Sequence, residues 1–146
     1  ENTDNYDRLK SILESLGELD NLVIFPIHPR TKNRIRDYNL EYLLEKLLVI
    51  DPVGYLDMIQ LERHAKIILT DSGGVQKEAF WLRVPCITLR DETEWTETIK
   101  YNWNRLVGAD RNKIVEAVLN IKDGDYIDFS NEYSASKICK VLKGVI

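Results

Sequence analysis

The chain has 146 residues, 44% of them hydrophobic, which is enough for one compact domain with a core of its own. Its 20 basic and 24 acidic side chains give a net charge of −4 with no basic block, so we expect no nucleic-acid partner. No apolar stretch approaches the roughly 18 residues of a membrane span, and the polar N-terminus has no signal-peptide character. These features predict a soluble, cytoplasmic protein without membrane contact.

Helical and strand patterns alternate along the chain. Apolar residues at helical spacing over 6–16 predict a first helix capped by Thr3 or Asp4 and closed by Gly17. Short apolar runs predict strands at 22–27, 47–50, 66–70, 86–89 and 104–107. Further helices are predicted at about 31–38, 55–63, 75–82, 111–121 and 132–142. Because the connections are too long for hairpins, we expect an α/β fold: a doubly wound, mostly parallel sheet with helices on both faces.

Cysteines and histidines give no sign of a metal centre. Cys86 lies in the apolar run 84–89 and Cys139 on the apolar stripe of the last predicted helix, so both are expected to be buried thiols. With two histidines in the chain, a zinc site is not expected. We predict no disulfide and no metal.

The segment 66–79 reads as a buried strand that ends in the polar turn Asp71-Ser72-Gly73-Gly74 and continues as a helix. Ser72 offers a hydroxyl, and the two glycines let backbone N–H groups approach an anion at the positive end of the helix. An ordinary strand-to-helix turn with Asp71 or Ser72 as N-cap explains this short pattern equally well. The third glycine of a dinucleotide loop is absent after Gly74, so no NAD is expected.

Polar residues follow four predicted strands at the point where each strand ends. His28 ends the first strand, 51–55 follow the second, 71–74 follow the third and 90–97 follow the fourth. In doubly wound sheets, ligands bind outside the carboxyl ends of the strands. This convergence favours a ligand site at that rim.

Single residues of this rim each have two interpretations. His28 before a proline is commonly a turn residue, but beside an anion-binding turn it would donate to a phosphate oxygen. Glu78 is either a solvated helix carboxylate or an acceptor for ribose hydroxyls. The segment 90–97 packs one Arg, four carboxylates and Trp95 into eight residues, which is typical of a solvated loop or, alternatively, of a sugar-facing one.

Four blocks together carry a resemblance that none carries alone. They are Phe25-Pro26-Ile27-His28-Pro29-Arg30-Thr31, Asp51-Pro52-Val53-Gly54-Tyr55-Leu56, Leu69-Thr70-Asp71-Ser72-Gly73-Gly74-Val75-Gln76-Lys77-Glu78-Ala79 and Leu89-Arg90-Asp91-Glu92-Thr93-Glu94. In this order they resemble the C-terminal half of the non-hydrolysing UDP-N-acetylglucosamine 2-epimerases. Glu1-Asn2 is similar to the end of that family's His-Arg-x-Glu-Asn segment, and the first residue is not Met, so we expect a fragment.

The resemblance implies a protein with two Rossmann-like domains arranged as in B-type glycosyltransferases. Residues 1–146 would be its UDP-binding C-terminal domain, and the N-terminal domain would be absent from this chain. A UDP-sugar ligand, no cofactor, and a homodimer of the full-length protein are implied as well. Because the family's acid and base carboxylates lie in the N-terminal half, the isolated chain is predicted to be inactive.

The resemblance also implies the residues of the UDP site. It implies that His28 and the turn 72–74 bind the diphosphate, that Glu78 binds the ribose and that the uracil lies near residues 53–58. His28 would also be the catalytic residue of this chain, stabilising the charge on UDP as it leaves. The loop that reaches toward the cleft matches at Arg90 and Glu94. The residues implied to bind UDP are His28, Val53, Met58, Ser72, Gly73, Gly74, Glu78, Arg90 and Glu94.

The implied activity interconverts UDP-GlcNAc and UDP-ManNAc. Anti-elimination of UDP gives a glycal, and UDP adds back after reprotonation on the opposite face. Two departures bear on the sugar: Met58 stands where members often have an aromatic ring, and Glu94-Trp95-Thr96-Glu97 replaces Glu-Arg-Pro-Glu, losing an Arg that helps to bind the diphosphate. With Asn102-Trp103-Asn104-Arg105-Leu106, the Trp95 loop looks more like the branch that acts on UDP-diacetamido-uronic acids.

Two other functions share parts of the pattern. The C-terminal domain of a B-type glycosyltransferase would have the same sheet, phosphate turn and ribose-binding Glu, but the enzyme would need an acceptor for the sugar. A non-enzymatic flavodoxin-like binding domain would show no preference for UDP over inorganic phosphate. Product analysis tests the first alternative, and a UDP titration tests the second.

Overall fold

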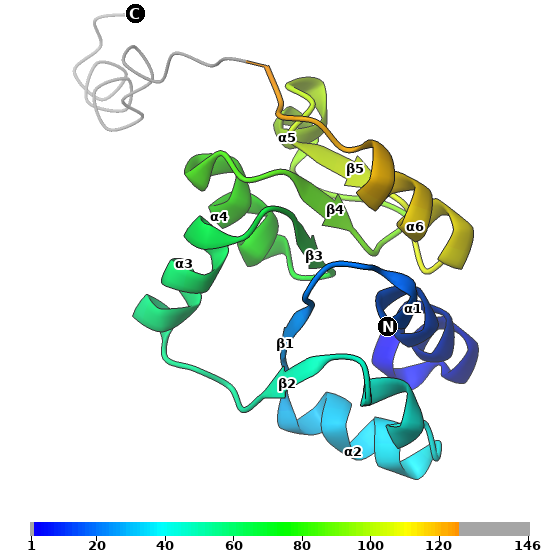
Figure 1. Ribbon diagram of the computed structural model, residues 1–146. Coiled ribbons are helices and arrows are strands. Elements are labelled where there is room, and N and C mark those ends of the chain that lie inside the picture. Colours follow the sequence, from blue (N-terminus) through cyan, green and yellow to red (C-terminus); the bar gives the residue numbers. More distant parts are fainter. Residues whose placement is uncertain (1, 126–146) are drawn as a thin grey trace, which may run out of the picture.

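The computed structural model describes residues 2–125 as strands alternating with helices (Figure 1). The strands are β1 (Ile24–Pro26), β2 (Leu48–Ile50), β3 (Ile68–Thr70), β4 (Cys86–Thr88) and β5 (Asn104–Leu106). The helices are α1 (Tyr6–Glu18), α2 (Pro29–Asp37), α3 (Tyr55–His64), α4 (Gly73–Leu82), α5 (Thr96–Lys100) and α6 (Arg111–Asn120), with short 3-10 helices η1 (Asn2–Asp4) and η2 (Glu41–Leu44). The predicted helix at 132–142 and Cys139 lie outside the described residues.

All the strand pairs between described residues are parallel, which confirms the α/β class with a parallel sheet. The pairing divides into two ladders where the alternation of elements suggested one: β1 with β2, and β3 with β4 and β5. Each strand is three residues long, so each ladder has few hydrogen bonds, and Pro26 ends β1 without an N–H to donate.

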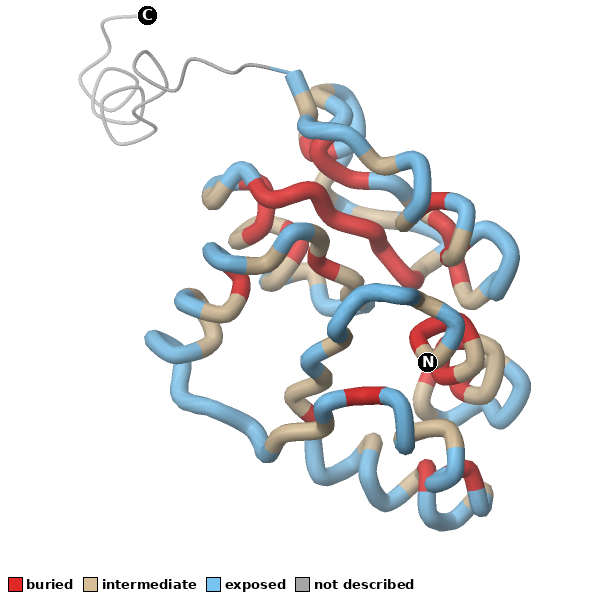
Figure 2. The backbone as a smooth tube through the Cα atoms, in the orientation of Figure 1, coloured by how far each residue is buried: buried red, intermediate tan, exposed pale blue. Residues whose placement is uncertain are grey.

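Helices cover both faces of the β3–β4–β5 ladder. Because side chains alternate along a strand, neighbouring residues of β4 enter different cores. Cys86 packs with Ala79 of α4, whereas Ile87 belongs to the main core together with Leu13 of α1 and Ile114 of α6. Every residue of β4 is buried (Figure 2). The predicted burial of Cys86 is therefore confirmed, and burial raises the pKa of its thiol to about 12.

Both ends of α1 differ from the sequence expectation. The N-cap is Asn5, whose Oδ1 accepts a backbone N–H three residues later at 3.0 Å. Thr3 and Asp4 belong instead to η1, which precedes the helix. Gly17 lies inside the helix and Leu19 is the C-cap, because the backbone keeps helical geometry through the glycine.

The carboxyl ends of β3 and β4 lead directly into segments that carry predicted site residues. From β3 the chain passes through residues 71–72 into α4, and from β4 it enters residues 89–95. After β2, residues 51–57 are all exposed and connect to the start of α3 (Figure 2). The three rim segments therefore differ in how well they are packed.

Candidate functional site

The turn between β3 and α4 has the features of an anion site. Ser72 is the N-cap of α4, its N–H donates to Thr70 Oγ1 at 3.0 Å, and its hydroxyl makes no capping hydrogen bond. Gly73 and Gly74 open the helix, and first-turn N–H groups have no acceptor within their own helix. The exposed hydroxyl of Ser72 and these N–H groups remain available to an anion.

A side-chain carboxylate lies at this helix end. Gly73 has no Cβ, and the space that a Cβ would occupy is taken by the Glu94 carboxylate, with the indole Nε1 of Trp95 at 3.3 Å from the same point. Arg90 pairs with Glu94 at 3.2 Å. The indole N–H of Trp95 is buried and finds no acceptor among the described residues. The structure thus brings three predicted residues together, Gly73, Arg90 and Glu94, with a negative charge beside the amino end of α4.

A buried polar network, which the sequence analysis missed, joins α4 to the loop after β4. Gln76 of α4 is fully buried, and its Oε1 accepts hydrogen bonds from Thr93 Oγ1 (2.6 Å) and Asn104 Nδ2 (3.3 Å). Asn104 also donates to Thr98 Oγ1 (3.1 Å) and accepts from Thr88 Oγ1 (2.7 Å). The spacing of apolar residues gives no information about polar groups that pair inside a core, so the sequence did not predict this network.

The segment expected as a loop at 90–97 runs into α5. Thr98 Oγ1 donates to the Trp95 carbonyl at 2.7 Å and closes the first turn of that helix. Lys77 of α4 pairs with Glu97, and its Nζ lies 4.5 Å from the centroid of the Trp95 ring. The hydrogen bond from Lys77 lowers the pKa of the Glu97 carboxyl. These contacts hold the Trp95 loop against α4.

Glu78, predicted to hold a ribose, lies on α4 where α3 packs against it. The charge of the nearby Glu78 carboxylate raises the pKa of the Tyr55 hydroxyl. Glu62 of α3 also faces Glu78 but is buried, with 2% of its surface exposed. Of the residues predicted near uracil, Val53 is exposed before α3 and Met58 is half-buried in that helix.

His28 is exposed and is the N-cap of α2. Its Nδ1 accepts the backbone N–H of Arg30 at 3.2 Å, which leaves Nε2 as the protonated, donating nitrogen of a neutral ring. Among the described residues, no hydrogen bond or ion pair joins His28 to the turn at 72–74, and β1 and β3 belong to different ladders. His28 therefore has the right donor, and its proximity to the turn stays a prediction.

The N-terminal segment reaches the same rim. Asn2 is buried, and its Nδ2 donates to Asp71 Oδ2 (3.1 Å) and to the Leu89 carbonyl (2.8 Å). Arg8 donates through Nε to Asn2 Oδ1 at 2.8 Å, and its Nη1 pairs with Asp91 Oδ2 at 3.0 Å. These contacts hold the N-terminal segment against the residues that follow β3 and β4.

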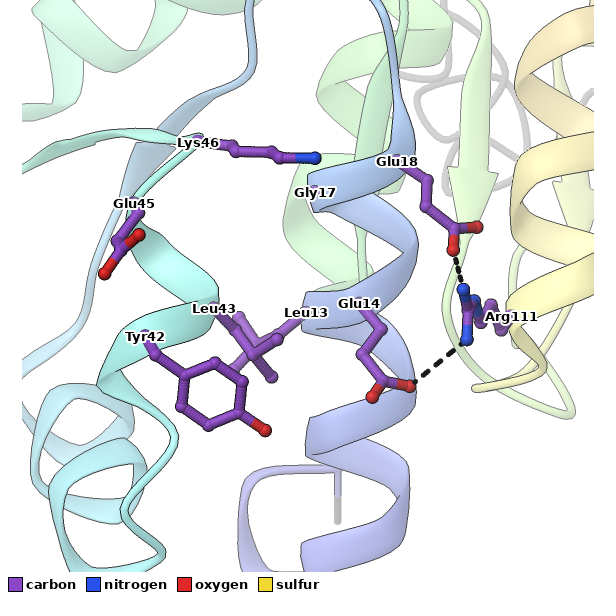
Figure 3. A pocket seen from close by; sticks show the side chains of 9 residues that line it. All are labelled: Leu13, Glu14, Gly17, Glu18, Tyr42, Leu43, Glu45, Lys46 and Arg111. Atoms are coloured by element: carbon purple, nitrogen blue, oxygen red, sulfur yellow. Dashed lines mark ion pairs between the residues drawn. The ribbon is translucent and has the colours of Figure 1, made fainter.

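A pocket lies away from these residues, between α1 and η2 (Figure 3). Its lining includes Glu14 and Glu18 of α1, Tyr42 of η2, and Arg111. Arg111 pairs with Glu14 at 3.6 Å and with Glu18. The pocket lining contains none of the predicted site residues.

The part of the chain that the structure describes contains neither a metal-binding cluster nor a membrane-spanning helix. Within residues 2–125, no group of three or more His, Cys, Asp or Glu side chains is placed to hold a metal ion. In the same range, no helix has the length and apolar character needed to span a bilayer.

This chain is similar in sequence to proteins of one known family. The sequence profile described as UDP-N-acetylglucosamine 2-epimerase matches residues 1–143. A Methanocaldococcus jannaschii protein named UDP-N-acetylglucosamine 2-epimerase is 47% identical over 97% of this chain and 42% of its own length. A Pseudomonas aeruginosa protein named UDP-2,3-diacetamido-2,3-dideoxy-D-glucuronate 2-epimerase is 51% identical over 80% of this chain and 33% of its own length.

A solved structure agrees with these matches. The M. jannaschii UDP-GlcNAc 2-epimerase in complex with UDP-GlcNAc and UDP aligns with a TM-score of 0.83 and 47% identity, over 97% of this chain and 42% of that chain. The chain thus spans less than half the length of these relatives, in their C-terminal part, and shares their B-type glycosyltransferase-like architecture there. The predicted resemblance is confirmed, and the chain belongs to the UDP-N-acetylglucosamine 2-epimerase family.

Proposed function

We propose that this chain is the UDP-binding, C-terminal domain of a nucleotide-sugar 2-epimerase whose acid and base carboxylates lie in a preceding domain. The observation that carries the proposal is the β3–α4 turn, where Ser72 and the first-turn N–H groups face the rim in a member of this family. A solved relative with 47% identity is described as a complex with UDP-GlcNAc and UDP, which supports the same ligand class here.

The diphosphate binds at the turn between β3 and α4. Backbone N–H groups of Gly73 and Gly74 and the Ser72 hydroxyl donate to its oxygens, and the positive end of α4 favours its charge. His28 adds a donor through Nε2, because its Nδ1 is engaged with the N–H of Arg30. When the diphosphate enters, the Glu94 carboxylate leaves Gly73, and Arg90 becomes available to a phosphate oxygen.

The nucleoside lies along the junction of α3 and α4. The Glu78 carboxylate accepts hydrogen bonds from ribose hydroxyls, and the Tyr55 hydroxyl holds Glu78 from the other side. Uracil lies against Val53 and Met58, which offer apolar contact but no aromatic ring for stacking. Glu94, once displaced from Gly73, faces the sugar.

The chemistry that this domain supports is the departure and return of UDP. Elimination breaks the bond between the anomeric carbon and the phosphate oxygen, so negative charge develops on the diphosphate. Fixed N–H donors and His28 stabilise that charge more in the transition state than in the bound substrate, which lowers the barrier. They also retain UDP until it adds back to the reprotonated glycal.

Two sugars fit this proposal. UDP-GlcNAc, epimerised to UDP-ManNAc, is the first because the profile and the M. jannaschii relative both bear that name. A UDP-diacetamido-uronic acid is the second because the P. aeruginosa relative reaches 51% identity over 80% of this chain. We further propose a homodimer and a cytoplasmic location for the complete enzyme, both from the family resemblance and the sequence character.

The test is product analysis with a full-length protein that contains this chain. Incubated with each UDP-sugar and no acceptor, it is expected to yield the 2-epimer, while the 146-residue chain alone yields none. His28→Asn keeps an N-cap but loses the Nε2 donor, so kcat should fall by about 100-fold. His64→Asn is the matched control, since His64 is exposed on α3 and outside the proposed site. Turnover that requires an acceptor would overturn the proposal in favour of a transferase.

A further inference from the structure

Glu62 is a buried carboxyl group without a donor. It lies in the last turn of α3, 2% of its surface is exposed, and neither of its oxygens receives a hydrogen bond from any described residue. An ionised carboxylate buried in this way costs several kcal/mol unless something neutralises it. Because Glu62 is buried where α3 packs against α4, its protonation state decides whether its burial is unfavourable.

Among residues 2–125, the titratable groups that influence Glu62 carry no positive charge. They are Glu78 of α4, Tyr55 of its own helix α3, and the Cys86 thiol of β4. Burial first, and then the charge of Glu78, raises the pKa of the Glu62 carboxyl to about 7. Burial keeps the Cys86 thiol protonated, with a pKa of about 12, so it adds no charge at neutral pH. A proton on Glu62 is therefore the simplest way for this group to remain buried.

The charge of Glu78 acts on both Glu62 and the Tyr55 hydroxyl, so the three groups lie close together where α3 packs against α4. A carboxylate has about four lone-pair positions, and two donors on the protein side leave the others for a ligand. A protonated Glu62 supplies the second protein donor, which an ionised Glu62 cannot do. Glu78 is then fixed between α3 and its own helix rather than free to rotate.

We propose that Glu62 is a positioning residue of the nucleotide site: as a carboxylic acid it donates to the Glu78 carboxylate and, with Tyr55, fixes it to accept the ribose hydroxyls. This inference rests on the proposed function, because it assigns a role at the same site. When Glu62 loses its proton, two adjacent carboxylates repel each other and Glu78 turns away. Affinity for the nucleotide is therefore high when Glu62 is protonated and falls as it ionises.

The first experiment needs no ligand. Carboxyl-carbon NMR of the chain labelled at glutamate should show Glu62 titrating with a midpoint of about 7. In Glu78→Gln the neighbouring negative charge is gone, so the Glu62 midpoint should fall, while staying above the ordinary value because burial persists. A wild-type midpoint near that ordinary value, or one that does not respond to Glu78→Gln, would overturn the coupling.

The second experiment measures affinity for UDP-GlcNAc from about pH 5.5 to 8.5. The UDP-sugar is preferable to UDP, since a terminal phosphate itself titrates near pH 6. Wild-type affinity should fall about threefold or more across this range. Glu62→Gln should bind at the wild type's low-pH affinity throughout, since an amide donates without titrating, and Glu62→Leu should bind weakly at every pH. Glu116→Gln, an exposed residue of α6, should keep the wild-type profile.

The outcomes separate the two proposals. If the wild type binds and Glu62→Gln keeps the same pH profile, the positioning role is overturned and the nucleotide site stands. If no variant binds UDP-GlcNAc at any pH, the nucleotide site itself is wrong, whatever the carboxyl titration shows. Equal binding by Glu62→Leu and wild type would mean that Glu62 is only a packing residue.

Discussion

The β3–β4–β5 region and the β1–β2 region differ in how deeply they are buried. In the first, β4 is buried throughout, and the buried network around Gln76 and Asn104 ties α4 to the loop after β4. In the second, both strands begin with exposed residues, Ile24 at 42% and Leu48 at 47%, and residues 51–57 are exposed as well.

This difference separates a preformed part of the site from an exposed part. N–H groups at the start of α4 are fixed by the helix, so the Glu94 side chain has to move but the backbone does not when a charged phosphate binds. Val53 and its neighbours have few contacts of their own, so they gain burial when a base covers them. We expect mutations to be costly for stability in the first region and mild in the second.

The largest effect on stability is expected for Asn104→Ala. Asn104 takes part in three buried hydrogen bonds, and its loss leaves the Thr88 hydroxyl and Gln76 oxygen with fewer partners. The free energy of unfolding should fall by about 3 kcal/mol, measured by urea denaturation. Asn112→Ala, on the exposed face of α6, should change it by less than about 0.5 kcal/mol. Similar losses in both variants would remove the basis of the comparison.

Gly73→Ala should have the largest effect on binding. The new Cβ would enter the space now held by the Glu94 carboxylate and lie 3.3 Å from Trp95 Nε1, which blocks an incoming phosphate. UDP affinity should fall at least about tenfold by calorimetry, with little loss of stability because the end of the Glu94 side chain can move.

Gly17→Ala is the matched glycine control. Apart from the local backbone of α1 and the two chain neighbours, no heavy atom of the described residues lies within 4 Å of a Cβ at Gly17. This variant should therefore gain about 0.5–1 kcal/mol of stability and bind UDP normally. Equal UDP affinity in the Gly73 and Gly17 variants would place the phosphate elsewhere.

Glu62, at the junction between the regions, should make stability depend on pH. Its pKa is raised from 4.5 to about 7, so the folded chain holds the proton more tightly than the unfolded chain. This contribution is complete below about pH 4.5 and is lost as the pH rises to about 7. The wild type loses this stability as the pH rises, whereas Glu62→Gln does not. The melting temperature of Glu62→Gln minus that of the wild type should therefore increase between about pH 4.5 and pH 7, and a constant difference would contradict the raised pKa.

Glu94→Gln should strengthen UDP binding modestly. The Glu94 carboxylate competes for the amino end of α4, and neutralising it removes an interaction of about 0.3–1 kcal/mol. UDP affinity should rise about two- to fivefold at low ionic strength, and the gain should shrink in high salt. Weaker UDP binding by this variant would show that Glu94 supports binding by orienting Arg90, with which it pairs.

The smallest effect is expected for Asp4→Asn. Asp4 pairs with Arg30 and Arg34 of α2, but all three side chains are at least 39% exposed. Exposed ion pairs are worth about 0–1 kcal/mol, so the free energy of unfolding should change by less than about 0.5 kcal/mol in urea. A loss above about 2 kcal/mol would mean that the β1–β2 region depends on its surface pairs.

Sequence patterns predicted which helices and strands form better than they predicted where these elements end and which polar contacts they make. Apolar runs identified the five strands within residues 2–125, and apolar spacing identified helices α1 to α4 and α6, since burial of one face leaves a periodic pattern. The short helix α5 and the 3-10 helices η1 and η2 were not predicted. The division into two ladders and the true cap, Asn5, depend on backbone geometry that periodicity does not encode. Of the site, the turn at 72–74 was visible because glycines and a hydroxyl are local signals.

Long-range polar pairing left no such signal. Gln76 and Asn104 are 28 residues apart and polar, so the pattern gave no reason to bury either one. Glu62 reads as an ordinary helix carboxylate until the packing of α3 on α4 is known. The position of Glu94 against Gly73 likewise depends on the path of a whole loop.

An amide-resolved NMR titration of this chain with UDP, with UMP and inorganic phosphate as controls, would establish whether this domain binds UDP at the turn between β3 and α4. We expect saturable shifts at Ser72, Gly73 and Gly74 and near Glu78 that are strongest for UDP. Shifts that are equal for UDP and inorganic phosphate, or that spare the turn at 72–74, would contradict a UDP site on this domain.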